Sequence, residues 1–438
     1  MFSAVARRVF RAIAFSSGCR GQHMHSPIAP ALRRLLGLGL LLLPPAAAAS
    51  GIGIGTPVEV PWLINDLESA TVAVLDDGSF AIASTEITEP QPQQFTVRFL
   101  AQFFAADGEP ETEPIALVPD NVALDGGIGT LGDRYFVTWI SATGAQAAFY
   151  DARGSRLGSA FPWLLSDIPF YVTHYRFGRA PSWRFLPVTY TFAGYDPENQ
   201  PFYRISLPVA GPDARLLGPP APLAPSRLSY VEDAAINGNG SFVVLSDQCS
   251  KNFQSQKPCV RGLQVFDGAG APRTPFLTAG VPQNLTSRGA VNSTISAAIG
   301  PRGQILLGWV TDIFRPTSTF LVRLYDQDGA PISMPLSAAA AAAPGPVALR
   351  LKALDDGSFL LFWATPAAGN AFTLYLRRLT AGAHELLPPV AAASGVITGI
   401  DLEINGSGRG ALAWQTRETG PNETFTLHGH VSLVTVNP

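Results

Sequence analysis

A repeated hairpin with a glycine turn is the feature that most constrains how this chain folds. Two distant segments are nearly the same: Val-Ala-Val-Leu-Asp-Asp-Gly-Ser-Phe at 72–80 and Leu-Lys-Ala-Leu-Asp-Asp-Gly-Ser-Phe at 351–359. Related segments occur at 235–246, 296–309 and 402–414. Each predicts a strand, a tight turn and a second strand, because Asp-Gly and Asn-Gly supply the positive φ that a short hairpin requires.

The spacing of these turns predicts the fold class. The turn glycines lie at positions 78, 132, 240, 303, 357 and 408, so the gaps are 54, 108, 63, 54 and 51 residues. The gap of 108 is two periods, and we expect a degenerate unit at roughly residues 166–224. A second Gly-containing hairpin follows the first in most units, the last example being Leu374–Gly382. Four strands in two hairpins make a propeller blade. The sequence therefore predicts an all-β, seven-bladed β-propeller of four-stranded antiparallel blades.

The two ends of the repeat region predict how the ring closes. The last unit supplies three strands, up to Thr435, whereas residues 56–64 resemble the fourth-strand segment at 109–118. We expect the N-terminal strand of the mature chain to complete the last blade, which removes an open sheet edge. An open solenoid is the structural alternative, and it does not need this match of the ends.

The first 49 residues differ from the rest and predict an export signal. Arg33 and Arg34 precede an apolar run at 35–43, which Pro44, Pro45 and an Ala-rich cleavage pattern follow. The run is shorter than the about 20 residues that a spanning helix needs, although an N-terminal membrane anchor is the alternative. Met24 offers a second start, which gives a leader of ordinary length. The predicted organisation is a leader at 1–49 and one propeller domain at 50–438.

The charge of the mature chain narrows the classes of partner. The leader holds six Arg and no acidic residue, so its removal leaves 33 acidic and 24 basic residues, a formal charge of −9. An acidic domain is a poor ligand for nucleic acid or for anionic lipid. No later segment is long and apolar enough to span a membrane. We expect a monomer, exported to the periplasm or the extracellular space.

The cysteines fit an oxidising compartment. Cys19 lies in the leader, which leaves Cys249 and Cys259 on either side of the polar stretch 250–258. We expect a disulfide that closes this loop. Two free thiols are the alternative; a zinc site would need further ligands, and no His lies near.

The candidate binding surface comes from the connections between the second and third strands of the units. These connections are long and varied, whereas the Gly turns are short, and blade geometry places them all on one face of the disc. Variable loops on a rigid scaffold commonly carry binding. The expected loops are 86–94, 247–260, 312–319, 366–370 and 417–423. The candidate binding residues on them are Lys251, Lys257, Asp312, Arg315 and Arg417.

Other conspicuous residues are better explained by structure than by chemistry. Trp139, Trp309, Trp363 and Trp414 hold one equivalent strand position, which predicts packing between blades. Asp77 and Asp356 precede turn glycines, where Asp binds nearby backbone amides. The segment Asp326-Gln-Asp-Gly lacks the later ligands of a calcium loop. No catalytic motif is present, and we expect no metal and no cofactor.

The repeat also resembles a known group of proteins. The element Asp-Gly-Ser-Phe-x-x-x-Trp followed by Arg-x-Tyr-Asp-x-x-Gly is similar to the delta-60-like repeats of bacterial exported β-propeller proteins. The resemblance covers roughly residues 56–438 and implies a fold and a location. It transfers no catalytic residue, because a fold does not define a function.

The function that the sequence predicts is a non-enzymatic binding or scaffold module, whose partner is a protein or a glycan bound on the long-loop face. The alternative is a hydrolase or lyase that acts on polysaccharide at the propeller channel. Such an enzyme needs carboxylate, His or Tyr side chains that converge on the channel mouth. The irregular third unit, with Tyr171, His174, Tyr175 and Arg176, is where such a group would lie.

Overall fold

The chain consists of two compact units, Met1–Pro45 and Ala46–Pro438, and all the residues described below belong to the second. The computed structural model describes residues 51–437 apart from these gaps: 64–70, 92–93, 121–124, 142–143, 165–169, 178–184, 196–200, 208, 212, 214, 216, 218–220, 223–227, 250–259, 283–294, 312–318, 338–347, 368–370, 387 and 420–424. The predicted leader thus lies outside the described residues and stays a prediction. No helix among the described residues is long and apolar enough to cross a membrane.

The described elements are β-strands that pair antiparallel with their neighbours in sequence. The first three sheets have the strand orders β3-β4-β5-β6, β10-β9-β8-β7 and β11-β12-β13-β14. Their strands are β3 (Thr71–Val74), β4 (Phe80–Gln91), β5 (Gln94–Phe104), β6 (Ile115–Ala116), β7 (Asp125–Leu131), β8 (Arg134–Ser141), β9 (Gly144–Tyr150), β10 (Arg156–Leu164), β11 (Phe170–Phe177), β12 (Phe185–Tyr195), β13 (Pro201–Leu207) and β14 (Ala221–Pro222). The third of these sheets occupies the stretch that the glycine spacing assigned to a degenerate unit.

The remaining sheets have the orders β15-β16-β17, β18-β19-β20-β21, β22-β23-β24-β25 and β1-β28-β27-β26. Their strands are β15 (Leu228–Ile236), β16 (Phe242–Cys249), β17 (Val260–Phe266), β18 (Ile295–Ile299), β19 (Ile305–Thr311), β20 (Thr319–Tyr325), β21 (Leu336–Ser337), β22 (Ala348–Ala353), β23 (Phe359–Pro366), β24 (Phe372–Leu379), β25 (Val390–Gly395), β26 (Ile397–Ile404), β27 (Arg409–Thr419), β28 (Phe425–Val436) and β1 (Ile52–Ile54). Strand β2 (Val58–Glu59) also pairs with β28.

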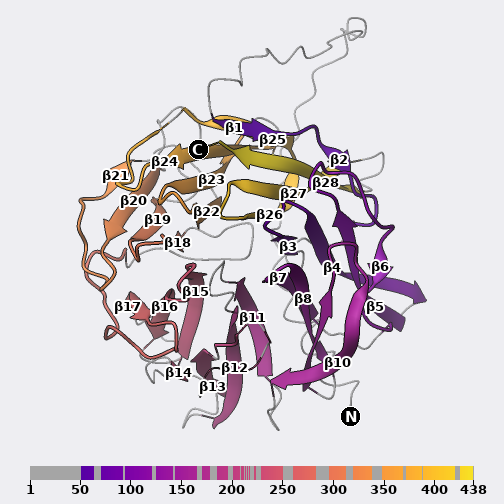
Figure 1. Ribbon diagram of the computed structural model, residues 1–438, viewed down its shortest axis with the longest axis horizontal. Coiled ribbons are helices and arrows are strands. Elements are labelled where there is room, and N and C mark those ends of the chain that lie inside the picture. The colour runs from indigo at the N-terminus through magenta and orange to yellow at the C-terminus, as the bar shows by residue number, and fades with distance from the viewer. Residues whose placement is uncertain are drawn as a thin grey trace, which may run out of the picture. The chain divides into compact units, whose positions relative to one another are not determined.

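The sheets follow one another around a ring. Their first strands contact each other in the cyclic order β3, β7, β11, β15, β18, β22, β26 and back to β3. Figure 1 shows these strands facing the centre of this unit, with later strands of each sheet farther out. Radial sheets around a central axis define a β-propeller. The closed cycle of contacts also rules out the open solenoid.

The ring closes by the pairing that the two ends of the repeat predicted. Ile52 and Ile54 of β1 lie opposite Val436 and Val434 of β28, and Glu59 of β2 lies opposite His430. The N-terminal strands therefore complete the sheet that the C-terminal strands begin. Chain segments from both ends of the described residues thus share one sheet. The pairing covers backbone N–H and C=O groups of β28 that would otherwise form an open sheet edge.

The turn glycines behave as the sequence predicted, with one correction. Glycines 78, 132, 240, 303, 357 and 408 all have φ between 73° and 95°. In the second hairpin of the β22–β25 sheet, however, Gly382 is not the residue with positive φ. Ala383 takes that role with φ 63°, and its N–H donates to the Thr380 carbonyl at 2.9 Å. This is the position that Gly154 and Gly329 fill in other sheets.

The core lies between neighbouring sheets, as the recurrent Trp position predicted. Trp139, Trp309, Trp363 and Trp414 are at most 5% exposed. Trp363 on β23 meets Phe320 of the preceding sheet edge-to-face, with ring centroids 5.6 Å apart. These rings are therefore interior packing and not a row of exposed ligand-stacking aromatics.

Candidate functional site

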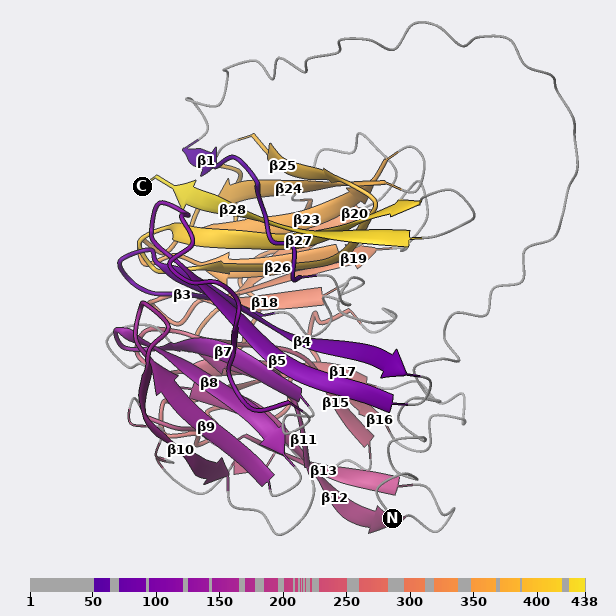
Figure 2. The same ribbon diagram turned by 90° about the vertical axis from the view of Figure 1, so that its right-hand side faces the viewer.

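The predicted long-loop face is formed by the connections between second and third strands. In Figure 2, β4 ends at one side of the unit, whereas the arrowheads of β24 and β28 point to the opposite side. All second strands run the same way, so their exits lie on one face. Parts of the expected loops are strand instead: β4 continues to Gln91 with β5 starting at Gln94, β16 continues to Cys249, and β27 continues to Thr419. The side chains in these segments do not alternate clearly between apolar and polar. The sequence therefore did not predict that the strands extend this far.

Arg417 is the one candidate binding residue among those described. It lies near the end of β27, opposite Leu427 of β28, and its side chain is exposed. Its N–H donates to the Val396 carbonyl at 2.9 Å. Lys251, Lys257, Asp312 and Arg315 lie outside the described residues and stay predictions.

The predicted disulfide also stays a prediction. Cys249 is the last residue of β16, whereas Cys259 lies outside the described residues. The next described residue is Val260, where β17 begins. The stretch 250–259 therefore joins two paired strands of one sheet.

A buried charge cluster that sequence reasoning missed holds the base of this stretch. The Arg261 side chain is 2% exposed, and its Nε and Nη2 donate to the two carboxylate oxygens of Asp247, both at 2.6 Å. Nη2 also lies 3.3 Å from Glu232 Oε1. A bidentate pair fixes both strands in register and orientation. The only sequence signal was opposite charges at the two ends of the expected loop.

The innermost strands are joined by side chains that accept backbone hydrogen bonds from the next sheet. The acceptor lies seven residues before the turn glycine of its unit in every case. The bonds are Val72 N–H to Asp401 Oδ2 (2.8 Å), Ile128 N–H to Thr71 Oγ1 (3.1 Å), Ala297 N–H to Asp233 Oδ2 (2.9 Å) and Leu351 N–H to Ser296 Oγ (3.1 Å). We call these contacts the inner-strand clasps. They satisfy edge N–H groups that would otherwise be costly to bury.

One junction uses an ion pair where a clasp is chemically impossible. The equivalent residue on β22 is Arg350, whose guanidinium cannot accept a hydrogen bond. Between β22 and β26, Lys352 Nζ instead lies 2.5 Å from Glu403 Oε2, and both side chains are partly exposed. Burial raises the pKa of the clasp residue Asp401, and the Lys352 charge opposes that shift. These charges join neighbouring sheets, which is a structural role.

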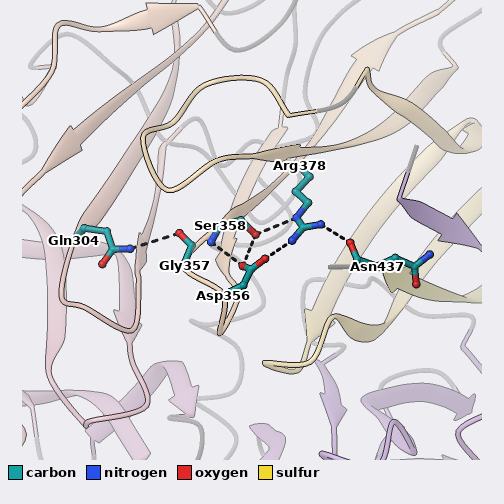
Figure 3. Close-up of polar contacts among 6 residues, drawn as sticks. All are labelled: Gln304, Asp356, Gly357, Ser358, Arg378 and Asn437. Carbon is teal, nitrogen blue, oxygen red and sulfur yellow. Dashed lines mark hydrogen bonds and ion pairs between the residues drawn. The ribbon is translucent and has the colours of Figure 1, made fainter. Parts of the chain in front are cut away.

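Asp77 and Asp356, which precede the turn glycines, are turn acceptors, as predicted. Asp77 Oδ1 accepts from the N–H of Ser79 at 2.8 Å and from its hydroxyl at 2.6 Å, and Asp356 holds Ser358 in the same way. Figure 3 shows that Arg378 adds to the second turn: it contacts Asp356 and donates to Ser358 Oγ. These two carboxylates hold the backbone of their turns.

The acidic residues of the Asp326 turn and the imidazole of His430 also have structural partners. Asp326 Oδ1 accepts from two N–H groups of its own turn, and Asp328 forms an ion pair with Arg273 at 2.9 Å. His430 Nε2 lies 2.9 Å from Thr416 Oγ1, and burial lowers the pKa of this imidazole. In the part of the chain described, no three His, Cys, Asp or Glu side chains gather as metal ligands.

The candidate residues of the irregular third unit lie on its innermost strand, β11. Tyr171, His174, Tyr175 and Arg176 lie on β11, which pairs with β12 with one register shift after Val172. Their side chains lie outside what the structure describes, so the sequence-based suggestion of a polar group there stays untested.

Comparisons with known proteins give no family. No protein-family model matches the chain, and no curated protein matches it. A solved protein of unknown function from Dyadobacter fermentans is 11% identical, with 88% of this chain and 99% of that chain covered and a TM-score of 0.49. An ulvan lyase, a polysaccharide lyase, is 8% identical, with coverages of 84% and 95% and a TM-score of 0.48. A calcium-binding regucalcin from Agrobacterium tumefaciens is 10% identical, with coverages of 70% and 88% and a TM-score of 0.36. Similarity at this level does not bear on function.

Proposed function

We propose that this protein is an exported, seven-bladed β-propeller that binds a protein or glycan partner on its long-loop face and performs no catalysis. The blade count is supported by the cyclic order of the first strands and by the glycine period. Export is supported by the sequence pattern of residues 1–49.

The observation that carries the non-enzymatic assignment is the engagement of the inner-strand charges. Asp233 and Asp401 accept N–H groups of the next sheet, and Glu403 pairs with Lys352. A catalytic carboxylate must be able to reach substrate and change its protonation state. Side chains that hold adjacent sheets together are committed to the scaffold. Among the described inner-strand side chains, the acids therefore support the fold.

The strands that support the long loops favour binding on the long-loop face. The Arg261–Asp247 pair fixes both strands that flank the stretch 250–259, and the long ladder of β27 and β28 carries Arg417 to an exposed place. Rigid supports lower the entropy that a loop loses when it binds. Variable segments on such supports are typical of recognition surfaces.

The test separates binding from turnover. The chain from Ser50 would be measured by affinity electrophoresis against a panel of neutral and uronic-acid polysaccharides, and by pull-down from extracellular protein of the producing cell. The comparison is a variant with Lys251→Ser, Lys257→Ser and Arg417→Ser, matched to Arg153→Ser and Arg273→Ser on the glycine-turn face. We expect one ligand that the first variant loses and the second keeps, with no new reducing ends or unsaturated sugars. Product formation by the wild-type chain would refute the assignment.

A further inference from the structure

The structure gives the three Asn-Gly dipeptides of the sequence different surroundings. They lie at 237–238, 239–240 and 405–406. An asparagine in this context is prone to lose its side-chain amide, because glycine has no Cβ to shield its backbone nitrogen from the Asn Cγ. Two of them are the same tripeptide, Asn-Gly-Ser, at 239–241 and 405–407. A difference in reactivity between these two must therefore come mainly from the fold.

The side chains of Asn237 and Asn405 are buried and bind neighbouring sheets. Asn237 Nδ2 donates to the Gly300 carbonyl at 3.1 Å, and Asn405 Nδ2 donates to the Leu75 carbonyl at 2.8 Å. Each amide nitrogen is thus bonded to the turn of the next sheet. Because Nδ2 is the leaving group in amide loss, these contacts between sheets must break before the reaction.

Asn239, in contrast, is exposed at the tip of its turn. Its Oδ1 accepts the N–H of Ser241 at 2.9 Å. This bond draws electron density from Cγ and stabilises the negative charge that builds up on the oxygen during attack. The Gly240 N–H donates to the Asn237 carbonyl at 2.9 Å, and this bond must open for the nitrogen to react. It lies within one hairpin, so its opening separates no sheets.

We propose that Asn239 is a site of spontaneous deamidation. The Gly240 nitrogen attacks Asn239 Cγ, and the new C–N bond closes a succinimide ring. The Cγ–Nδ2 bond breaks, and the proton from the Gly240 nitrogen leaves with Nδ2 as ammonia. Solvent water then adds to either ring carbonyl and opens the ring to aspartate or isoaspartate. The product carries an additional negative charge on the glycine-turn face, and the reaction does not depend on the long-loop face.

The turn is already suited to the aspartate product. Asn239 holds the position that Asp77 and Asp356 hold in their turns, directly before the turn glycine. In both of those turns, Oδ1 accepts the N–H and the hydroxyl of the following serine. An aspartate at 239 can bind Ser241 in the same way. The isoaspartate product inserts an extra backbone carbon, which disturbs the register of the hairpin.

The test follows amide loss at the two Asn-Gly-Ser sites. The chain from Ser50 is held at mildly alkaline pH, where the backbone nitrogen loses its proton more readily. Samples taken over time are digested, and mass spectrometry measures the conversion of amide to acid in each peptide. The matched control is the same incubation in guanidinium chloride, which unfolds the chain. The variant Asn239→Asp reproduces one product, and its melting temperature is compared with that of the wild type.

In the folded chain we expect Asn239 to lose its amide at least about tenfold faster than Asn405, because the buried amide must first give up its bonds to another sheet. In guanidinium chloride the two rates should become similar, and Asn239→Asp should melt at the wild-type temperature. Equal rates in the folded chain, or faster loss at Asn405, would overturn the proposal. A folded chain that keeps Asn239 intact while the unfolded chain reacts would overturn it as well. A clearly lower melting temperature of Asn239→Asp would refute the fit of the aspartate product.

Discussion

Arg378 joins the penultimate residue of the chain to the sheet that precedes the closing sheet. Its side chain is 6% exposed, its Nε donates to Ser358 Oγ at 3.1 Å, its Nη1 donates to the Asn437 carbonyl, and its Nη2 pairs with Asp356 (Figure 3). Asn437 in turn donates its N–H to the Gly51 carbonyl at 2.6 Å. Arg378 therefore ties both described ends of the chain to a neighbouring sheet.

The substitution Arg378→Met keeps most of the apolar stem and removes the donors. A hydrogen bond to a charged group contributes about 1.5–3 kcal/mol. Three contacts are lost, but Asp356 is 41% exposed and regains water, so its part must be discounted. We expect a loss of about 2–3 kcal/mol in the free energy of unfolding at pH 7. The assay is urea unfolding, with Arg153→Met at an exposed turn position as a control that should change stability by less than about 0.5 kcal/mol.

The same substitution should change how stability depends on pH. Burial raises the pKa of Asp356, but hydrogen bonds from Ser358 and the charge of Arg378 outweigh it and lower the pKa overall. A carboxyl with a lowered pKa in the folded state stabilises above its unfolded pKa of about 3.9, and this contribution is lost as pH falls through the folded pKa. The gap between wild type and Arg378→Met should therefore narrow below about pH 4. A gap that is absent at pH 7, or constant down to acid pH, would refute this account.

Two further predictions concern the turns and the inner-strand clasps. Gly154→Ala adds a Cβ 2.5 Å from the Phe103 ring at positive φ, whereas Gly132→Ala has the same φ problem with nothing within 4 Å. Thermal melts should show a loss of about 1 kcal/mol for Gly132→Ala and at least about 2 kcal/mol more for Gly154→Ala; equal losses would contradict the close packing. Asp233→Ala removes the acceptor of the Ala297 N–H and should cost about 2–4 kcal/mol in urea unfolding, and amide exchange at Ala297 should speed up. An Asp233→Ala chain as stable as wild type would show that the clasp contributes nothing.

The sequence predicted those parts of the fold that local chemistry encodes. Positive φ at turn glycines follows from residue type and needs no knowledge of distant neighbours, so the positions of Gly78 and Gly357 were correct. The equivalent Trp positions predicted the core, because one repeated environment implies one repeated contact. The positive φ of Ala383 was not predicted, because the neighbouring Gly382 is the residue type expected at that turn position. Ala383 is 4% exposed, so its methyl group is buried.

The contacts between sheets were not predictable in the same way. The Val72–Asp401 clasp joins residues 329 positions apart, and Arg378 reaches Asn437 across 59 positions. Such pairs are defined by which sheets become neighbours, and this depends on the ring. Once the ring is known, the acceptor seven residues before each turn glycine becomes a recognisable pattern. Arg350 then stands out as the exception, and the Lys352–Glu403 pair explains how its junction holds.

Closure of the ring by the N-terminal strands is tested most directly by a truncation. The reference is the chain from Ser50, and the variant lacks residues 51–66. The deletion removes β1 and β2 together with Val60 and Leu63, each 1% exposed. It also removes the Leu63 carbonyl, which accepts a hydrogen bond from the Gln415 amide at 3.1 Å. Burial of the two side chains alone is worth about 3–6 kcal/mol. We expect the melting temperature to fall by at least about 5 °C, with partial recovery when a peptide of residues 51–66 is added. An unchanged melting temperature would contradict the closed ring.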